Sequence, residues 1–135
     1  MIVVADTSPL HYLVLVGAID VLPSLFRQVL IPAAVHEELR HPGAPLAVRQ
    51  WLASRPAWLE VRQAGPVSDP GLSELDAGEA EAIMLVGQLP GSAMLLMDDA
   101  RGRREASRRG LRRSTARGPR RRGSWRGYVC FYDNM

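Results

Sequence analysis

The sequence contains no lysine, because all 17 of its basic residues are arginine. This absence argues against two classes of acidic-site α/β protein, namely nucleotide-binding proteins with a phosphate-loop lysine and receiver domains with a lysine near their end. Cysteine is almost as scarce, and Cys130 alone allows no internal disulfide. A chain without disulfides fits a reducing compartment, so we expect a cytoplasmic protein.

Long apolar runs are also missing. The most apolar stretch, residues 10–25, is interrupted by His11, Asp20 and Pro23 and falls short of the roughly 20 apolar residues that a bilayer requires. The opening residues MIVVAD lack the basic region of a signal peptide. We therefore expect neither export by that route nor a membrane partner.

What the chain does have is the size and composition of one globular domain. It contains 135 residues, of which 47% are hydrophobic, and a domain of this size buries roughly two-thirds of its unfolded surface. Its charge is divided, since residues 1–100 carry 12 acids and 5 arginines whereas residues 101–135 carry 12 arginines and 2 acids. The net charge is thus −7 in the first part and +10 in the second.

Strand and helix patterns alternate along the first part of the chain. Apolar, β-rich runs predict strands at residues 2–5, 28–31, 58–61 and 93–97, and helical spacing with capping residues predicts helices at 9–18, 19–26, 33–40, 44–54 and 76–89. A Ser8-Pro9 start is expected for the first of these helices. Such alternation predicts an α/β fold with a central parallel sheet covered by helices on both faces.

Two of the predicted strands end in acids, Asp6 after the first and the pair Asp98-Asp99 after the last. Sites in open parallel sheets form beyond the carboxyl ends of the strands, so these acids point to one site. Two carboxylates about 4 Å apart repel by roughly 4 kcal/mol at an effective dielectric of about 20, and a divalent cation relieves that repulsion. Hard cations such as Mg²⁺ and Mn²⁺ prefer oxygen ligands, so the pattern suggests a metal site.

Four motifs then resemble, in order and spacing, those of the PIN-domain family. They are DTSPL at 6–10, IPAAVHEEL at 31–39, LDAGEAEAI at 75–83 and LLMDDARGR at 95–103. The subgroup with DTSPL and GEAEAI motifs is related to the VapC-type toxins of toxin-antitoxin pairs. The resemblance implies a three-layer α/β fold and a Mg²⁺- or Mn²⁺-dependent endoribonuclease. Its partners would be RNA, an antitoxin protein and, as a further candidate, a second copy of the chain.

The resemblance also assigns site residues. Asp6 would be the first metal ligand, with Ser8 hydrogen-bonding within the site, although a plain strand-end aspartate would look the same in the sequence. Glu38 matches the second acid of the family better than Glu37 does, and one of these two is expected to be solvated surface.

The third and fourth acids leave alternatives open. Glu79 would be the third ligand, but Asp76 and Glu79 also form the D-x-x-E pattern of a helix capping box. Asp76 is expected to cap the helix in either case. The fourth ligand is Asp98 or Asp99, and the sequence does not separate them; we assign the catalytic role to Asp99 and count both as metal ligands.

Other polar residues have plainer interpretations. His11, His36 and His41 lack metal-ligand spacing and are expected to be structural or surface residues. Arg101 and Arg103 follow the acid pair and are expected either to contact RNA phosphates or to form a solvated helix face.

The chain departs from the family after residue 111. Residues 112–126 contain seven arginines in fifteen positions and show neither helix nor strand period. We therefore divide the chain into a PIN-like nuclease domain at 1–111 and an arginine-rich irregular tail at 112–135. We hypothesise that the tail is a frameshift product that replaces the last strand and helix of the fold and exposes a sheet edge. The competing hypothesis is a basic tail that binds RNA.

Two other function classes are alternatives to a nuclease. A non-catalytic or degenerate PIN protein would bind RNA without cleaving it. A haloacid-dehalogenase-like phosphatase would need an aspartate two residues after Asp6, where Ser8 stands.

Overall fold

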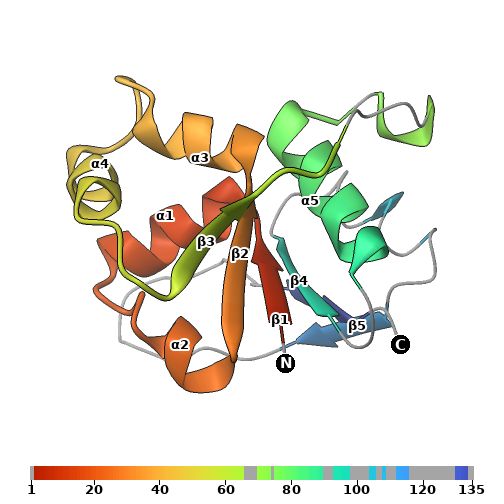
Figure 1. Cartoon of the computed structure of the whole chain (residues 1–135), viewed down its shortest axis with the longest axis horizontal. Coiled ribbons are helices and arrows are strands. Elements are labelled where there is room, and N and C mark those ends of the chain that lie inside the picture. The colour runs from red at the N-terminus through yellow and green to blue at the C-terminus, as the bar shows by residue number, and fades with distance from the viewer. Residues whose placement is uncertain are drawn as a thin grey trace.

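The structure is a computed structural model of the whole chain, and it describes residues 2–65, 70–73, 75–89, 93–97, 104–105, 108, 112–115 and 130–133. Its centre is a six-stranded sheet in the order β3-β2-β1-β4-β6-β5 (Figure 1). The strands are β1 (Ile2–Ala5), β2 (Gln28–Pro32), β3 (Leu59–Arg62), β4 (Ala93–Met97), β5 (Arg112–Thr115) and β6 (Cys130–Asp133).

The first four strands along the chain pair in parallel, as the alternation of elements predicts. β1 lies between β2 and β4, with Val4 opposite Leu30 on one side and Leu95 on the other. β3 forms the edge beside β2. Strands that are buried on both faces read as continuous apolar runs, which is why β1 and β4 could be located from the sequence.

Helices cover both faces of this parallel part (Figure 1). They are α1 (Thr7–Leu15), α2 (Val21–Leu25), α3 (Ala33–Arg40), α4 (Leu46–Ala53) and α5 (Ala77–Gln88), with a short 3₁₀ turn at Pro70–Leu72. Successive strand side chains point to opposite faces. Val3 and Ala5 accordingly pack into the core that α1 to α4 cover, and Val4 packs into the core that α5 covers. The result is the three-layer α/β fold that was expected.

One helix start differs from the prediction. α1 begins at Thr7 with Asp6 at the N-cap position, two residues before the expected Ser8-Pro9 start. Pro9 is consequently the third residue of the helix, where its missing N–H would have no partner inside the helix in any case. The helix therefore follows the carboxyl end of β1 without a loop, and Asp6 lies at the junction.

The segment 112–135, expected to be irregular, contains two strands. β6 pairs antiparallel with both β4 and β5, so the sheet continues where an exposed edge beside β4 was expected. A strand edge offers unpaired N–H and C=O groups to any segment that can extend along it, whatever its side-chain pattern. The division of the chain at residue 111 stays a prediction.

No helix among the described residues is long and apolar enough to cross a membrane.

Candidate functional site at the carboxyl edge of the sheet

Asp6 is buried at the carboxyl end of the central strand. Its residue is only 3% exposed, and its backbone N–H donates a hydrogen bond to the carbonyl of Leu96 in β4 at 3.0 Å. This bond extends the pairing of β1 with β4 by one residue. It holds the backbone of Asp6 beside the end of the strand that precedes Asp98 and Asp99, which lie outside the described residues.

Glu38 comes from α3, which begins directly after β2. Its Oε2 accepts a hydrogen bond from the hydroxyl of Thr7, the residue that follows Asp6. Glu38 is half-buried, whereas the side chain of Glu37 is 68% exposed and lies 3.5 Å from the guanidinium of Arg40. The structure therefore distinguishes the two neighbouring acids, because Glu38 is half-buried and Glu37 lies at the surface.

Glu79 lies in the first turn of α5. Asp76 caps this helix as expected, because its Oδ1 accepts a hydrogen bond from the backbone N–H of Glu79 at 2.9 Å. Glu79 itself is only 8% exposed. A carboxylate is costly to bury, so this burial exceeds what a surface capping residue would require. The ligand role of Glu79 stays a prediction.

Gly78 brings the first turn of α5 against Glu38. A Cβ added to Gly78 would lie 2.8 Å from Oε1 of Glu38. Glu38 therefore contacts the sequence neighbours of both other predicted ligands, Thr7 beside Asp6 and Gly78 beside Glu79. Residues 6, 38 and 79 are in this way drawn to one region of the sheet edge.

His11 lies one helical turn after Thr7 in α1 and is close enough to Glu38 to interact with its charge. Burial lowers the pKa of His11 from its ordinary value of 6.5, and the negative charge of Glu38 partly opposes this shift. Its Nε2 is buried and has no hydrogen-bond partner among the described residues. The burial of His11 was not predicted, and its only signal in the sequence is the spacing of four residues from Thr7, which places both on one helix face.

The donor atoms of Asp6, Glu38 and Glu79 are all carboxylate oxygens, the ligand type that Mg²⁺ and Mn²⁺ prefer. Within the described part of the chain, however, no three His, Cys, Asp or Glu residues are placed to hold a metal ion together. The donor chemistry of these three residues fits a hard divalent cation, and the fourth predicted ligand, Asp98 or Asp99, lies outside the described residues.

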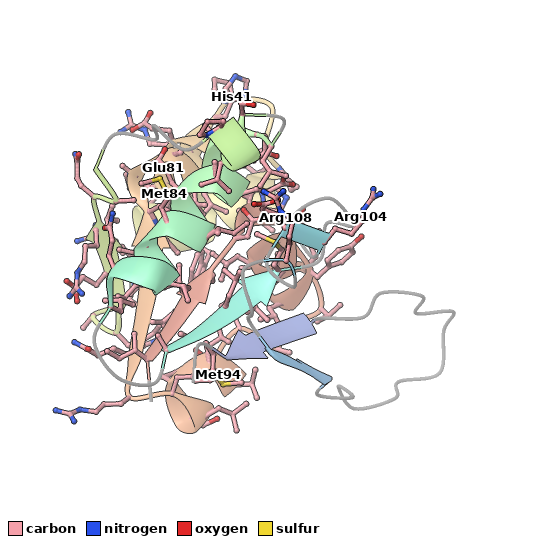
Figure 2. All side chains as sticks on the ribbon, turned by 90° about the vertical axis from the view of Figure 1, so that its right-hand side faces the viewer. His41, Glu81, Met84, Met94, Arg104 and Arg108 are labelled. Atoms are coloured by element: carbon pink, nitrogen blue, oxygen red, sulfur yellow. The ribbon has the colours of Figure 1, made fainter. Side chains whose placement is uncertain are left out.

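Arginines lie on the same side of the molecule. Figure 2 shows Arg104 and Arg108 beyond the end toward which β4 points. The side chain of Arg108 is 69% exposed and lies 3.0 Å from Glu105. Arg101 and Arg103, the arginines predicted to contact phosphates, lie outside the described residues.

Comparison with known proteins gives the family. The sequence model of the PIN domain matches residues 2–115 and so covers all the motifs on which the resemblance depends. Neither the curated proteins nor the solved structures gave a match. PIN domains are generally nucleases, they bind RNA, and they typically use divalent metals. The chain belongs to the PIN-domain family.

Proposed function

We propose that this protein is a Mg²⁺- or Mn²⁺-dependent endoribonuclease that hydrolyses RNA phosphodiester bonds. The observation that carries the proposal is the burial of Asp6 and Glu79, 3% and 8% exposed, in the part of a PIN domain where strand ends and helix starts meet. Burial of charged groups is costly and is concentrated at functional sites.

The proposed ligands are Asp6, Glu38, Glu79 and the pair Asp98-Asp99, with Asp99 in the catalytic set. A divalent cation bound by these oxygens would activate a water molecule and neutralise charge on the scissile phosphate. The protein's own residues supply the geometry, since the Thr7 hydroxyl holds one oxygen of Glu38. Arg104 and Arg108 are candidates to hold RNA phosphates near the site, because both are exposed on the side toward which β4 points.

The test is an RNA cleavage assay in Mg²⁺ and in Mn²⁺, each with and without EDTA. We expect EDTA to abolish cleavage and Asp6→Asn to reduce it by at least about 100-fold, since even outer-shell substitutions at metal sites cost roughly 10–100-fold. Asp20→Asn is the matched control, because Asp20 is exposed and does not cap α2 through its side chain. Activity in EDTA, or an Asp6→Asn variant as active as the control, would contradict the proposal.

A paired comparison tests the second acid. Glu38→Gln is expected to lose activity, and Glu37→Gln is expected to keep it, because only Glu38 turns toward Thr7 and Gly78. Equal losses in the two variants would count against the assignment of Glu38.

We further propose that the nuclease is the toxin of a toxin-antitoxin pair in the cytoplasm, on the resemblance of its DTSPL and GEAEAI motifs to VapC-type toxins. Induced expression should then arrest growth, and coexpression of a small protein encoded beside it should relieve the arrest. The Asp6→Asn variant should not arrest growth. Normal growth after induction of an active nuclease would contradict the toxin role.

The alternative that the sequence leaves open is a non-catalytic PIN protein that binds RNA without cleaving it. In that case RNA would bind equally well with and without EDTA, and neither metal would support cleavage.

A further inference from the structure

The carboxylate of Glu38 is enclosed from two helices. One oxygen, Oε2, accepts the hydrogen bond of the Thr7 hydroxyl in α1, and the other, Oε1, faces Gly78 in α5. Thr7 and Gly78 are both buried. We propose that Thr7 and Gly78 are positioning residues that fix the Glu38 carboxylate for metal binding, an inference that rests on the proposed nuclease function.

The glycine at position 78 is explained by space and not by backbone conformation. Among the described residues only Gly17 and Gly65 have positive φ, so Gly78 adopts a conformation that any residue can adopt. Alanine is the better helix former. What alanine would meet is the carboxylate of Glu38, with Oε1 at 2.8 Å and Cδ at 3.3 Å from the added Cβ.

The atoms around the added Cβ indicate which group would move in a Gly78→Ala variant. The closest atom is the end of a flexible side chain, and the nearest other group is Cγ2 of Val35 at 3.3 Å. The Glu38 carboxylate can swing away without moving a backbone, and the contact with Val35 requires a shift of only a few tenths of an ångström, so the helix should still fold with alanine at position 78. Gly78→Ala should therefore displace the Glu38 carboxylate without lowering the free energy of unfolding.

Thr7 restrains the same carboxylate through a hydrogen bond from its hydroxyl to Oε2 of Glu38. A hydroxyl donor on one oxygen fixes the rotation of the carboxylate, and groups that orient metal ligands in this way typically cost roughly 10–100-fold in metal affinity or activity when removed. Thr7→Val keeps the shape of the side chain and removes the donor, whereas Thr7→Ser keeps the donor.

The first experiment compares Gly78→Ala with Gly87→Ala in the same helix. Gly87 is exposed, and a Cβ there would meet nothing within 4 Å. Three quantities are measured for each full-length variant: kcat for RNA cleavage, Mn²⁺ affinity by calorimetry, and the unfolding midpoint in EDTA. We expect Gly78→Ala to lower kcat and Mn²⁺ affinity by about 10–100-fold with an unchanged or higher midpoint. Gly87→Ala should leave kcat and Mn²⁺ affinity unchanged.

A double variant separates positioning from a general disturbance. Glu38→Asp shortens the side chain by one methylene and withdraws the carboxylate from position 78. If Gly78→Ala acts through this carboxylate, it should cost much less in the Glu38→Asp background than in the wild type. For Thr7, the serine variant should keep activity near the wild-type value and the valine variant should lose it.

The outcomes distinguish this inference from the proposed function. A wild type that cleaves RNA, with a Gly78→Ala variant that cleaves equally well, overturns the positioning role and leaves the nuclease proposal standing. A Gly78→Ala variant that loses stability and activity together, with equal losses in the Glu38→Asp background, also overturns it. If the wild type binds Mn²⁺ without cleaving RNA, only the nuclease proposal fails and the Mn²⁺ affinities still test positioning. A wild type that neither cleaves nor binds Mn²⁺ overturns both.

Discussion

At the scale of single residues, the main feature is the concentration of acidic and polar side chains around the junction of β1 and α1. Asp6 and Thr7 are both buried there, and the hydroxyl of Thr7 reaches across to Glu38. The hydroxyl of Thr7 thus contacts a carboxylate from another helix. Such an arrangement holds the groups in place at some cost in solvation, which is usual where ligand binding supplies the compensation.

His11 gives a prediction on pH at this scale. Burial lowers its pKa in the folded protein below the ordinary value of 6.5. The unfolded chain therefore binds a proton first as the pH falls, and folding stability that is present above pH 6.5 is lost as the pH falls through the folded pKa. We expect His11→Gln, which stays neutral, to remove part of the loss of stability between about pH 7.5 and 5.5.

The measurement is chemical denaturation of wild type and His11→Gln across this pH range in EDTA. His41→Gln is the control, because this residue is exposed. Parallel stability curves for wild type and His11→Gln would show that His11 does not contribute.

Individual site residues could be predicted from the sequence to different degrees. Asp6 could be placed because it ends a buried apolar run, and Glu38 was preferred to Glu37 only through the family resemblance. Thr7 and Gly78 were missed as partners of Glu38. Thr7 lies 31 positions away from Glu38, and such a contact depends on how helices pack, which local patterns do not report.

At the scale of elements, burial determined what the sequence could predict. β1 and β4 were located to the residue because both are continuous apolar runs buried on both faces. The start of α1 was missed because Ser8-Pro9 is a common helix start, whereas Asp6 occupies the N-cap position without a capping hydrogen bond from its side chain. β5 and β6 were missed because the arginine-rich segment around them shows no strand period. Their pairing is non-local, since β6 pairs with β4, and β5 pairs with β6.

The start of α5 provides the prediction at this scale. Asp76→Ala removes the oxygen that accepts the Glu79 N–H, and loss of an N-cap side chain costs about 1 kcal/mol. We expect the unfolding midpoint in EDTA to fall by a few degrees. RNA cleavage should fall as well, because the same bond fixes the turn that carries Gly78 and Glu79.

Asp76→Ser is the matched variant, since serine is also a good N-cap residue. It should restore most of the stability and most of the cleavage activity. An Asp76→Ala protein as stable as the wild type would contradict the cap.

At the scale of the whole molecule, the sheet joins two parts of opposite charge. β6 and β5 belong to the segment 101–135 with net charge +10, and they continue a sheet whose other strands belong to the segment 1–100 with net charge −7. Under the frameshift hypothesis, an unrelated segment would pair with β4 only because the edge of that strand is exposed. Under the RNA-binding hypothesis, the same pairing would anchor the basic segment near the site. Under either hypothesis we expect β6 to contribute to the free energy of unfolding, because it pairs with strands on both sides.

β6 is the strand to test, because it has a neighbour on each side. Phe131 lies opposite Leu96 of β4 and Ser114 of β5. Proline there has no N–H to donate, and proline is found essentially only at sheet edges and bulges. Phe131→Pro should therefore lower the free energy of unfolding by more than about 1 kcal/mol relative to Phe131→Ala, which loses the ring but keeps the N–H. Denaturation of both variants measures this difference. Equal stabilities would mean that β6 does not fold cooperatively with the four parallel strands.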